Sequence, residues 1–375
     1  MDLGVLLEMS HRYGADEDYV LEGGGNTSVK ENGVLYVKGS GTHLSNITME
    51  QFVAMDLERL WGMLELPPVQ DLSDEERDAR TLSAMMAARL PGEGAKRPSV
   101  EAALHALFPY RYVLHVHPPL INGLTCGADG EASCGLLFGD RAVWIGLTQP
   151  GFALAQTCKG AFARHKKKTG AHPRIVLMEN HGVFAAADTV AGIDSIMEHV
   201  AEAIRGCVAE EPDFGEAAFD MELASSIERT VRMLYAGDGG TASAIFCTNK
   251  QVCEFVAGAE AFRPLTRLFL PDHILYCMDE PLFIGTEADI AVGFSDYAAR
   301  KGFLPRIVAV RGLGFFALGS NEKTARQAKM LFLDAIKVAV YARAFGGARP
   351  LPDWFVKSIS NSEAGRYRMR ISQES

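Results

Sequence analysis

The chain has 375 residues, enough for two to three domains of about 150 residues each, and its hydrophobic (48%) and charged (22%) fractions are typical of globular proteins. These values exclude the disordered, collagen-like and disulfide-scaffold classes. The 37 basic and 47 acidic residues give a net charge of −10, which argues against duplex nucleic acid as a partner, because such binding needs many cationic contacts to phosphates.

Seven cysteines are scattered along the chain without a CxxC pair, which predicts reduced thiols in a reducing compartment. The N-terminal residues lack the basic and apolar regions of a signal peptide, and the apolar runs are too short to cross a bilayer. The sequence therefore predicts a soluble cytoplasmic protein with no membrane partner.

Four features are expected in the first 80 residues: a helix at 3–14, a hairpin with strands around Val29 and at 34–37, a helix at 47–64, and a surface connection at 67–80. The hairpin is predicted by the Asn32-Gly33 pair, a strong turn signal. The second helix is predicted by Thr48 at its start and Gln51 in its first turn.

The middle of the chain alternates between helical and extended patterns. We expect helices at 99–108, 154–168 and 189–208, and strands at 112–117, 173–177 and 183–186. The acidic segment 209–219 contains Pro and Gly and is the expected linker. This organisation predicts two domains, at residues 1–210 and 211–375.

Three histidines stand in unusual local settings. His115 and His117 are two residues apart on a predicted strand, so their side chains share one face of the sheet. His181 lies in a tight Asn-His-Gly turn between two strands. Three imidazoles that leave an open coordination position are typical of a catalytic zinc site. The alternative is that the pair is structural and that His181 hydrogen-bonds locally in its turn.

Glu101 is the carboxylate of interest, because it lies in the first turn of the helix expected after Pro98-Ser99. A glutamate at this position commonly stabilises the N-terminus of a helix. The functional alternative places it over the open face of the metal site as a base. Spacing alone does not decide between the two.

Two glycine-rich turns, at 23–28 and 38–42, could present backbone N–H groups and hydroxyls to a phosphate or carboxylate. The alternative is that both are ordinary hairpin turns. Neither has the GxGxxG pattern or the GK[ST] ending of a P-loop, so nucleotide binding is not indicated.

Five motifs in order, GGNTS, KGSGT, PSVE, HVHP and ENHG, span Gly24 to Ala187 and resemble the class II aldolase/adducin-like family. The residues of these motifs are most similar to those in the aldolase part of bifunctional rhamnulose-1-phosphate aldolase/alcohol dehydrogenases. The resemblance implies an α/β fold, an αβα sandwich with a central, mainly antiparallel sheet. No strand–GxxxGxG–helix pattern follows Ala209, so we expect no dehydrogenase domain and no NAD.

The resemblance further implies a zinc-dependent aldolase that cleaves or forms a carbon–carbon bond in a sugar phosphate or related hydroxy-ketone, through a metal-stabilised enediolate. It implies metal ligands at His115, His117 and His181, an acid/base at Glu101, and phosphate contacts at Asn26, Ser40, Gly41 and Ser99. Val100 stands where some phospho-sugar aldolases carry a second serine, which puts phosphate specificity in doubt.

Three alternatives remain open on the same scaffold. An epimerase or a dehydratase would use the same ligands and the same glutamate. A non-catalytic, adducin-like interaction module would be expected to have lost them. In each case we expect a homo-oligomer, and for an enzyme a small-molecule substrate.

The second half repeats part of the first. Residues 306–308 and Gly314 match 174–176 and Gly182 at an offset of 132, which puts Leu313 in the place of His181. A looser match pairs 271–275 with 109–113 and would put Cys277 and Asp279 in the places of His115 and His117. We therefore expect a duplicated fold whose second copy has lost the metal ligands.

Overall fold

The protein is described from a computed structural model that covers residues 3–65, 74–237, 240–363 and 365–367. The chain divides into two compact units. The first comprises Met1–Thr125, Asp129–Cys207 and the segment from Lys357 onward, and the second comprises Cys126–Ala128 and Val208–Val356. The C-terminal segment thus groups with the first unit rather than with the second.

The first unit contains a seven-stranded sheet in the order β3-β2-β1-β4-β7-β6-β5. Its strands are β1 (Asn26–Glu31), β2 (Val34–Lys38), β3 (Phe52–Asp56), β4 (Tyr112–Val116), β5 (Ala142–Ile145), β6 (Ile175–Met178) and β7 (Gly182–Ala187). Neighbouring strands are antiparallel except β5 and β6, which are parallel.

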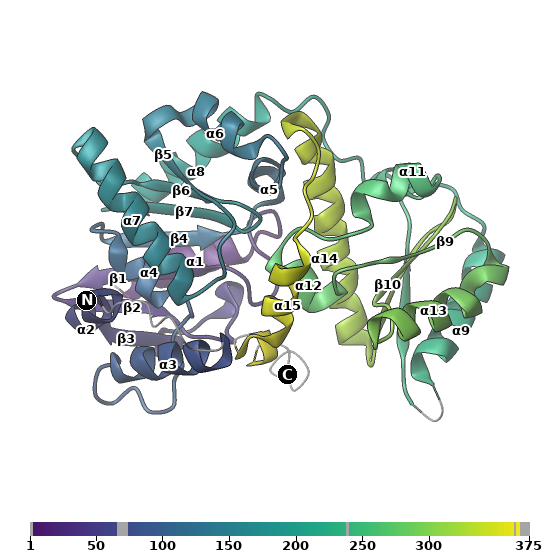
Figure 1. The fold of residues 1–375 in the computed structure, drawn as a ribbon, viewed down its shortest axis with the longest axis horizontal. Coiled ribbons are helices and arrows are strands. Elements are labelled where there is room, and N and C mark those ends of the chain that lie inside the picture. Colours follow the sequence, from purple (N-terminus) through teal and green to yellow (C-terminus); the bar gives the residue numbers. More distant parts are fainter. Residues whose placement is uncertain (1–2, 66–73, 238–239, 364, 368–375) are drawn as a thin grey trace. The chain divides into compact units, whose positions relative to one another are not determined.

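Helices cover both faces of this sheet (Figure 1). One face carries α1 (Leu3–Gly14), α5 (Pro119–Thr125) and α8 (Val190–Arg205), and the other carries α2 (Leu57–Glu65), α4 (Ala102–Leu107) and α7 (Phe152–Thr169). Two further helices are α3 (Asp74–Ala87) and α6 (Gly130–Phe138). The predicted αβα sandwich with a mainly antiparallel sheet is confirmed.

Side chains alternate along β1 and so connect the sheet to both helical layers. The Thr27 hydroxyl lies 2.7 Å from the Ser10 hydroxyl of α1. Ser28, the next residue, lies 2.7 Å from a ring nitrogen of His105 on α4. Because Asn26 is two residues before Ser28, it shares the α4 side of the sheet.

Two expectations for the first unit are wrong. The predicted helix at 47–64 is instead a single 3-10 turn at Met49–Gln51, followed by β3 and α2. The capping signal at Thr48 is real, but the residues after Gln51 pair with β2 as an edge strand, so sheet pairing overrides the local helical pattern. The predicted connection at 67–80 contains the start of α3, and residues 67–73 lie outside the described residues.

The second unit contains a four-stranded sheet in the order β8-β11-β10-β9. Its strands are β8 (Ser243–Cys247), β9 (Leu282–Ile284), β10 (Ile307–Val310) and β11 (Gly314–Gly319). The helix α14 (Glu322–Tyr341) packs on one face, and α9 (Met221–Ala236) and α13 (Ile290–Lys301) pack on the other. The other helices of this unit are α10 (Lys250–Phe255), α11 (Ala259–Phe262) and α12 (Pro271–Cys277), and α15 (Asp353–Asn361) spans the boundary between the units.

The four strands of the second sheet follow the same path as β4-β7-β6-β5 of the first sheet. In both, the second and third strands in chain order pair in parallel and the other pairs are antiparallel. The looser sequence match is wrong, however, because residues 271–277 form helix α12 whereas 112–116 form a strand. The counterpart of β4 by topology is β8.

None of the helices in the described part of the chain is both long and apolar enough to cross a membrane. None of the seven cysteines, all within the described residues, forms a disulfide bond.

Candidate active site

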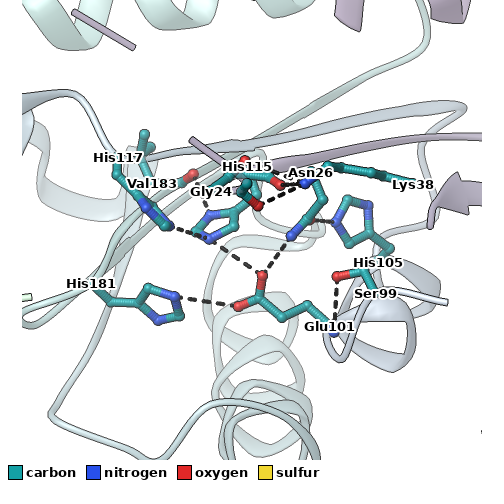
Figure 2. Close-up of polar contacts among 12 residues, drawn as sticks. Gly24, Asn26, Lys38, Ser99, Glu101, His105, His115, His117, His181 and Val183 are labelled. Atoms are coloured by element: carbon teal, nitrogen blue, oxygen red, sulfur yellow. Dashed lines mark hydrogen bonds and ion pairs between the residues drawn. The ribbon is translucent and has the colours of Figure 1, made fainter. Parts of the chain in front are cut away.

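Three histidines meet where β4 ends and where β6 turns into β7 (Figure 2). His115 lies within β4, His117 follows that strand, and His181 lies in the turn, where Asn180 has a positive φ of 52°. Ring nitrogens that could bind a metal ion all lie within 4.8 Å of one another. The structure thus brings together the three histidines that the sequence singled out.

His115 is held in one protonation state. Its Nδ1 lies 3.0 Å from the Val183 carbonyl oxygen, which only accepts hydrogen bonds, so Nδ1 carries the proton. Burial holds the pKa of His115 well below its usual range, so the ring is neutral. Its Nε2 therefore presents a lone pair, 2.9 Å from Nε2 of His117, and the ring stacks on Phe184. A neutral ring oriented through its other nitrogen is the form that binds metals.

Glu101 faces the histidines instead of stabilising its helix. It is the residue that precedes α4, but its side chain makes no capping hydrogen bond. Its Oε2 lies 3.3 Å from Nε2 of His115, and its Oε1 lies 3.4 Å from Nε2 of His181. The side chain is buried, so these contacts exclude bulk water. The orientation supports the functional interpretation of Glu101.

The environment of Glu101 favours its ionised form. Burial alone would raise the pKa of this carboxyl, but positive charge held at the histidine cluster, together with the hydrogen bond from the Asn26 amide, outweighs burial and lowers it. Oε1 is buried and has no hydrogen-bond partner among the described residues. A buried carboxylate oxygen of this kind is costly unless a cation or a proton donor satisfies it.

These residues fit a divalent metal ion. Three imidazole nitrogens converge, as in catalytic zinc sites with three protein ligands and one open position. The carboxylate oxygen of Glu101 that lacks a hydrogen bond lies beside the same cluster. Gly182 makes room for the histidine cluster, because a Cβ there would lie 2.6 Å from the Val116 carbonyl oxygen and 2.7 Å from the His117 ring.

Asn26 joins the site from the first residue of β1, where it is paired with His115 across the sheet. Its Nδ2 donates a hydrogen bond of 2.7 Å to Oε2 of Glu101 (Figure 2). Its Oδ1 is hydrogen-bonded to Nε2 of His105, and Nδ1 of His105 lies 2.7 Å from the Ser28 hydroxyl. From the sequence, His105 is expected to be a neighbour of Glu101 or a residue that supports it, and no specific role is assigned to it. The signals for a role were its i+4 spacing from Glu101 and the two-residue spacing of Asn26 and Ser28 on one strand face.

The two glycine-rich turns are connected by Lys38, a buried residue that sequence reasoning did not single out. Its ammonium group donates to the carbonyl oxygens of Gly23 at 2.8 Å and Gly25 at 3.0 Å. Gly25 has a φ of +60°, and a Cβ there would lie 2.8 Å from the His115 carbonyl oxygen. Lys38 therefore holds the first turn against the strand that carries His115.

The remaining predicted residues fall into two groups, one beside Glu101 and one in the neighbouring turn. Ser99 is in it: its hydroxyl accepts a hydrogen bond from the Glu101 amide, and its own amide donates to the Lys38 carbonyl. Ser40 and Gly41 are part-exposed in the turn that follows Lys38, and the Ser40 amide donates to the Arg97 carbonyl at 2.8 Å. Asn26 and Ser99 thus adjoin Glu101, whereas Ser40 and Gly41 occupy the neighbouring turn.

Comparison with known proteins gives a family and several similar structures. The model of the class II aldolase and adducin N-terminal domain matches residues 5–207. A curated relative, the uncharacterized oxidoreductase YuxG of Bacillus subtilis, is 24% identical over 91% of this chain, and the chain spans only 54% of that relative's length.

Two solved structures illustrate the similarity. The N-terminal class II aldolase domain of a Thermoplasma acidophilum protein is 25% identical, covers 55% of this chain and 92% of its own, and has a TM-score of 0.45. The L-fuculose-1-phosphate aldolase from Thermus thermophilus is 17% identical, with 54% and 90% coverage and a TM-score of 0.32.

Proposed function

Because the chain belongs to the class II aldolase and adducin N-terminal domain family, we propose that it is a metal-dependent aldolase. Its reaction would cleave or form a carbon–carbon bond in a sugar phosphate or related hydroxy-ketone. The observation that carries this proposal is the convergence of three imidazoles on a buried carboxylate, Glu101. A non-catalytic member would not need to keep these groups in this geometry.

In this proposal His115, His117 and His181 hold a divalent ion, with zinc preferred because all three donors are imidazole nitrogens. The bound ion supplies a Lewis acid that polarises the substrate carbonyl. The Val183 carbonyl fixes the orientation of the His115 ring, and the stack on Phe184 keeps that ring in place.

Glu101 moves a proton at the carbon next to the substrate carbonyl. Its ionised state suits it to accept that proton, and burial keeps competing water away. Its two oxygens have different surroundings: Oε2 accepts from Asn26, whereas Oε1 lacks a hydrogen bond within the described residues. We therefore assign proton transfer to Oε1.

We propose that Ser40, Gly41, Ser99 and Asn26 bind the substrate's phosphate or hydroxyl groups. The part-exposed turn offers the Gly41 N–H group and the Ser40 hydroxyl, which suit an anion, whereas the Ser40 N–H is taken by the Arg97 carbonyl. Because Val100 offers no hydroxyl next to Ser99, substrates with and without a phosphate both belong in the test.

We also propose that the second domain, residues 211–375 by the sequence boundary, is a degenerate copy of the catalytic domain at 1–210. The shared order of four strands supports this. The segment from Lys357 onward is the exception, since it groups with the first unit. We also propose that the protein is cytoplasmic and forms a homo-oligomer.

A substrate panel tests the proposed reaction. Zinc-loaded protein is incubated with dihydroxyacetone phosphate or dihydroxyacetone and a series of hydroxy-aldehydes, and the products are identified by NMR. A new carbon–carbon bond that requires the metal supports the aldolase. An inverted centre without cleavage indicates an epimerase, and loss of water indicates a dehydratase. Absence of both metal uptake and turnover would favour an adducin-like module.

A further inference from the structure

A chain of four polar side chains runs from β1 through α4 to the candidate base. Ser28 lies 2.7 Å from Nδ1 of His105, Nε2 of His105 is bonded to Oδ1 of Asn26, and Nδ2 of Asn26 lies 2.7 Å from Oε2 of Glu101. Figure 2 shows the last two contacts side by side. All four residues are buried, and Ser28 and His105 have no exposed surface. Buried networks of this kind have only a few consistent proton arrangements.

His105 is neutral in this chain. Burial, reinforced by the positive charge of Lys30, lowers the pKa of His105 to about 3, against a smaller opposing effect of Glu101. A neutral imidazole carries one N–H, so one ring nitrogen donates and the other accepts. Two arrangements of the chain follow, and they place opposite ends of the Asn26 amide against Glu101.

The orientation of the Asn26 amide selects one of them. Its Nδ2 donates to Oε2 of Glu101, so its Oδ1 faces Nε2 of His105. Because an amide oxygen only accepts hydrogen bonds, Nε2 of His105 carries the proton and Nδ1 is left to accept. The consistent arrangement runs in one direction: the Ser28 hydroxyl donates to His105, His105 donates to Asn26, and Asn26 donates to Glu101.

We propose that His105, kept as its Nε2–H tautomer by the Asn26 carbonyl oxygen, is a positioning residue that aims the Asn26 amide at Oε2 of Glu101. This holds the carboxylate in one rotamer and leaves Oε1 toward the reacting centre. The inference rests on the proposed function for the role of Glu101, but the tautomer and the direction of the chain do not depend on any reaction.

The first test uses no substrate. Protein labelled with ¹⁵N-histidine is compared as wild type and as Ser28→Ala, with the His105 signals assigned through His105→Gln. We expect wild-type His105 to show a protonated Nε2 and an unprotonated Nδ1 at pH 7, and Ser28→Ala to keep this tautomer, because the Asn26 oxygen still accepts from Nε2. A wild-type ring protonated on Nδ1 would overturn the proposal whatever the enzyme's activity.

The second test measures kcat, KM and metal content. His105→Leu should lower kcat by about 10–100-fold with KM and zinc stoichiometry nearly unchanged, the range expected from losing a hydrogen bond to a charged group. His105→Gln should retain kcat within about fivefold, because its amide can donate to Asn26 and accept from Ser28. If His105→Leu does not fold, Ser28→Ala takes its place, with an expected fall in kcat of about threefold or more.

Ser10→Ala is the matched control. Ser10 is equally buried and is hydrogen-bonded to the next residue of the same strand, Thr27, but on the opposite face of the sheet. We expect it to lower stability and leave kcat unchanged. Equal losses in His105→Leu and His105→Gln, or a loss in Ser10→Ala as large as in His105→Leu, would reduce the network to a structural role. Absence of wild-type turnover would count against the proposed function and leave the tautomer test standing.

Discussion

Two stretches of this chain fold into the same four-stranded arrangement, yet within the described residues only the first brings together histidines that could hold a metal ion. β4-β7-β6-β5 in the first unit and β8-β11-β10-β9 in the second have the same order and the same directions. In the first, the strand ends and the turn carry three histidines. In the second, the offset of 132 places Leu313 where His181 stands.

The register of the ladders extends this comparison to the other two ligands. His115 lies opposite Phe184, and Phe316, which is 132 residues after Phe184, lies opposite Phe246. Phe246 is therefore the counterpart of His115. His117 follows β4 directly, as Thr248 follows β8, so the counterparts of all three histidines in the second unit lack an imidazole.

The second unit keeps an aromatic contact at these positions although it lacks the imidazole nitrogens. The His115 ring stacks on Phe184 with centroids 4.1 Å apart, and the Phe246 ring lies 5.0 Å from Phe316. Strand pairing and an aromatic contact are therefore kept without any ligand, because the fold depends on backbone hydrogen bonds and apolar burial. The comparison separates the residues that build the sheet from those that perform chemistry.

The largest expected effect is on metal content. His117→Ala removes one of three imidazoles, and we expect bound zinc to fall to background while the protein stays folded. Thr248→Ala, at the equivalent position of the second unit, should leave zinc stoichiometry unchanged. Elemental analysis and circular dichroism of both variants measure this. Full zinc retention in His117→Ala would remove His117 from the site.

Glu101→Gln should have the next largest effect. The amide keeps the shape and some hydrogen bonding but does not accept the proton, so we expect retained zinc and a loss in turnover of about 10²–10⁴-fold. Glu222→Gln is the control, because Glu222 lies in the first turn of α9, which precedes β8 as α4 precedes β4. Its cost should be a few tenths of a kcal/mol. Near-normal turnover in Glu101→Gln would contradict its assignment as the base.

The glycines at equivalent positions of the two units, Gly182 and Gly314, offer a third comparison. A Cβ at Gly182 would lie 2.6 Å from the Val116 carbonyl oxygen, and one at Gly314 would lie 2.6 Å from the Cys247 carbonyl oxygen. We expect each alanine variant to lose about 1–3 kcal/mol of stability, the usual range for overpacking. Only Gly182→Ala should also weaken zinc binding, because its Cβ would meet the His117 ring. Chemical denaturation and zinc titration separate the two effects, and equal zinc affinities would contradict this account.

The fourth expected effect is a pH dependence of stability, which is small per pH unit near neutrality. The pKa of His105 is lowered to about 3 in the folded protein and is about 6.5 when unfolded. Between these values the unfolded chain binds a proton that the folded protein does not, so His105 makes stability fall as pH falls from about 6.5 toward 3. Metal-free His105→Gln should show a shallower slope, by up to about 1.4 kcal/mol per pH unit. Parallel slopes would mean that His105 is protonated when folded.

Much of the first unit follows from local sequence signals. The hairpin at Asn32-Gly33, the strand with His115, and the turn with His181 form as predicted, because each depends on short-range turn chemistry or strand alternation. The convergence of the three histidines was predictable for the same reason. The role of Glu101 was not settled by spacing, because a helix start suits both a capping and a catalytic glutamate.

What the sequence did not reveal depends on contacts between distant segments. The edge strand at 52–56 forms through pairing with β2, which the helical pattern around it conceals. Lys38 reaches the carbonyls of the glycine turn only once the sheet is built. The looser repeat was wrong because the similar residues at 271–275 belong to a helix. The counterpart of β4 by topology is β8, which has little sequence similarity to it.

The central claim is that the first unit alone holds a metal ion on three histidines. Anomalous diffraction from crystals of the full chain grown with zinc and a hydroxamate mimic of the enediolate tests it most directly. We predict one strong peak within bonding distance of the Nε2 atoms of His115, His117 and His181, and none beside Phe246 or Leu313. An empty histidine cluster at full zinc occupancy elsewhere, or a second peak in the other unit, would contradict the account.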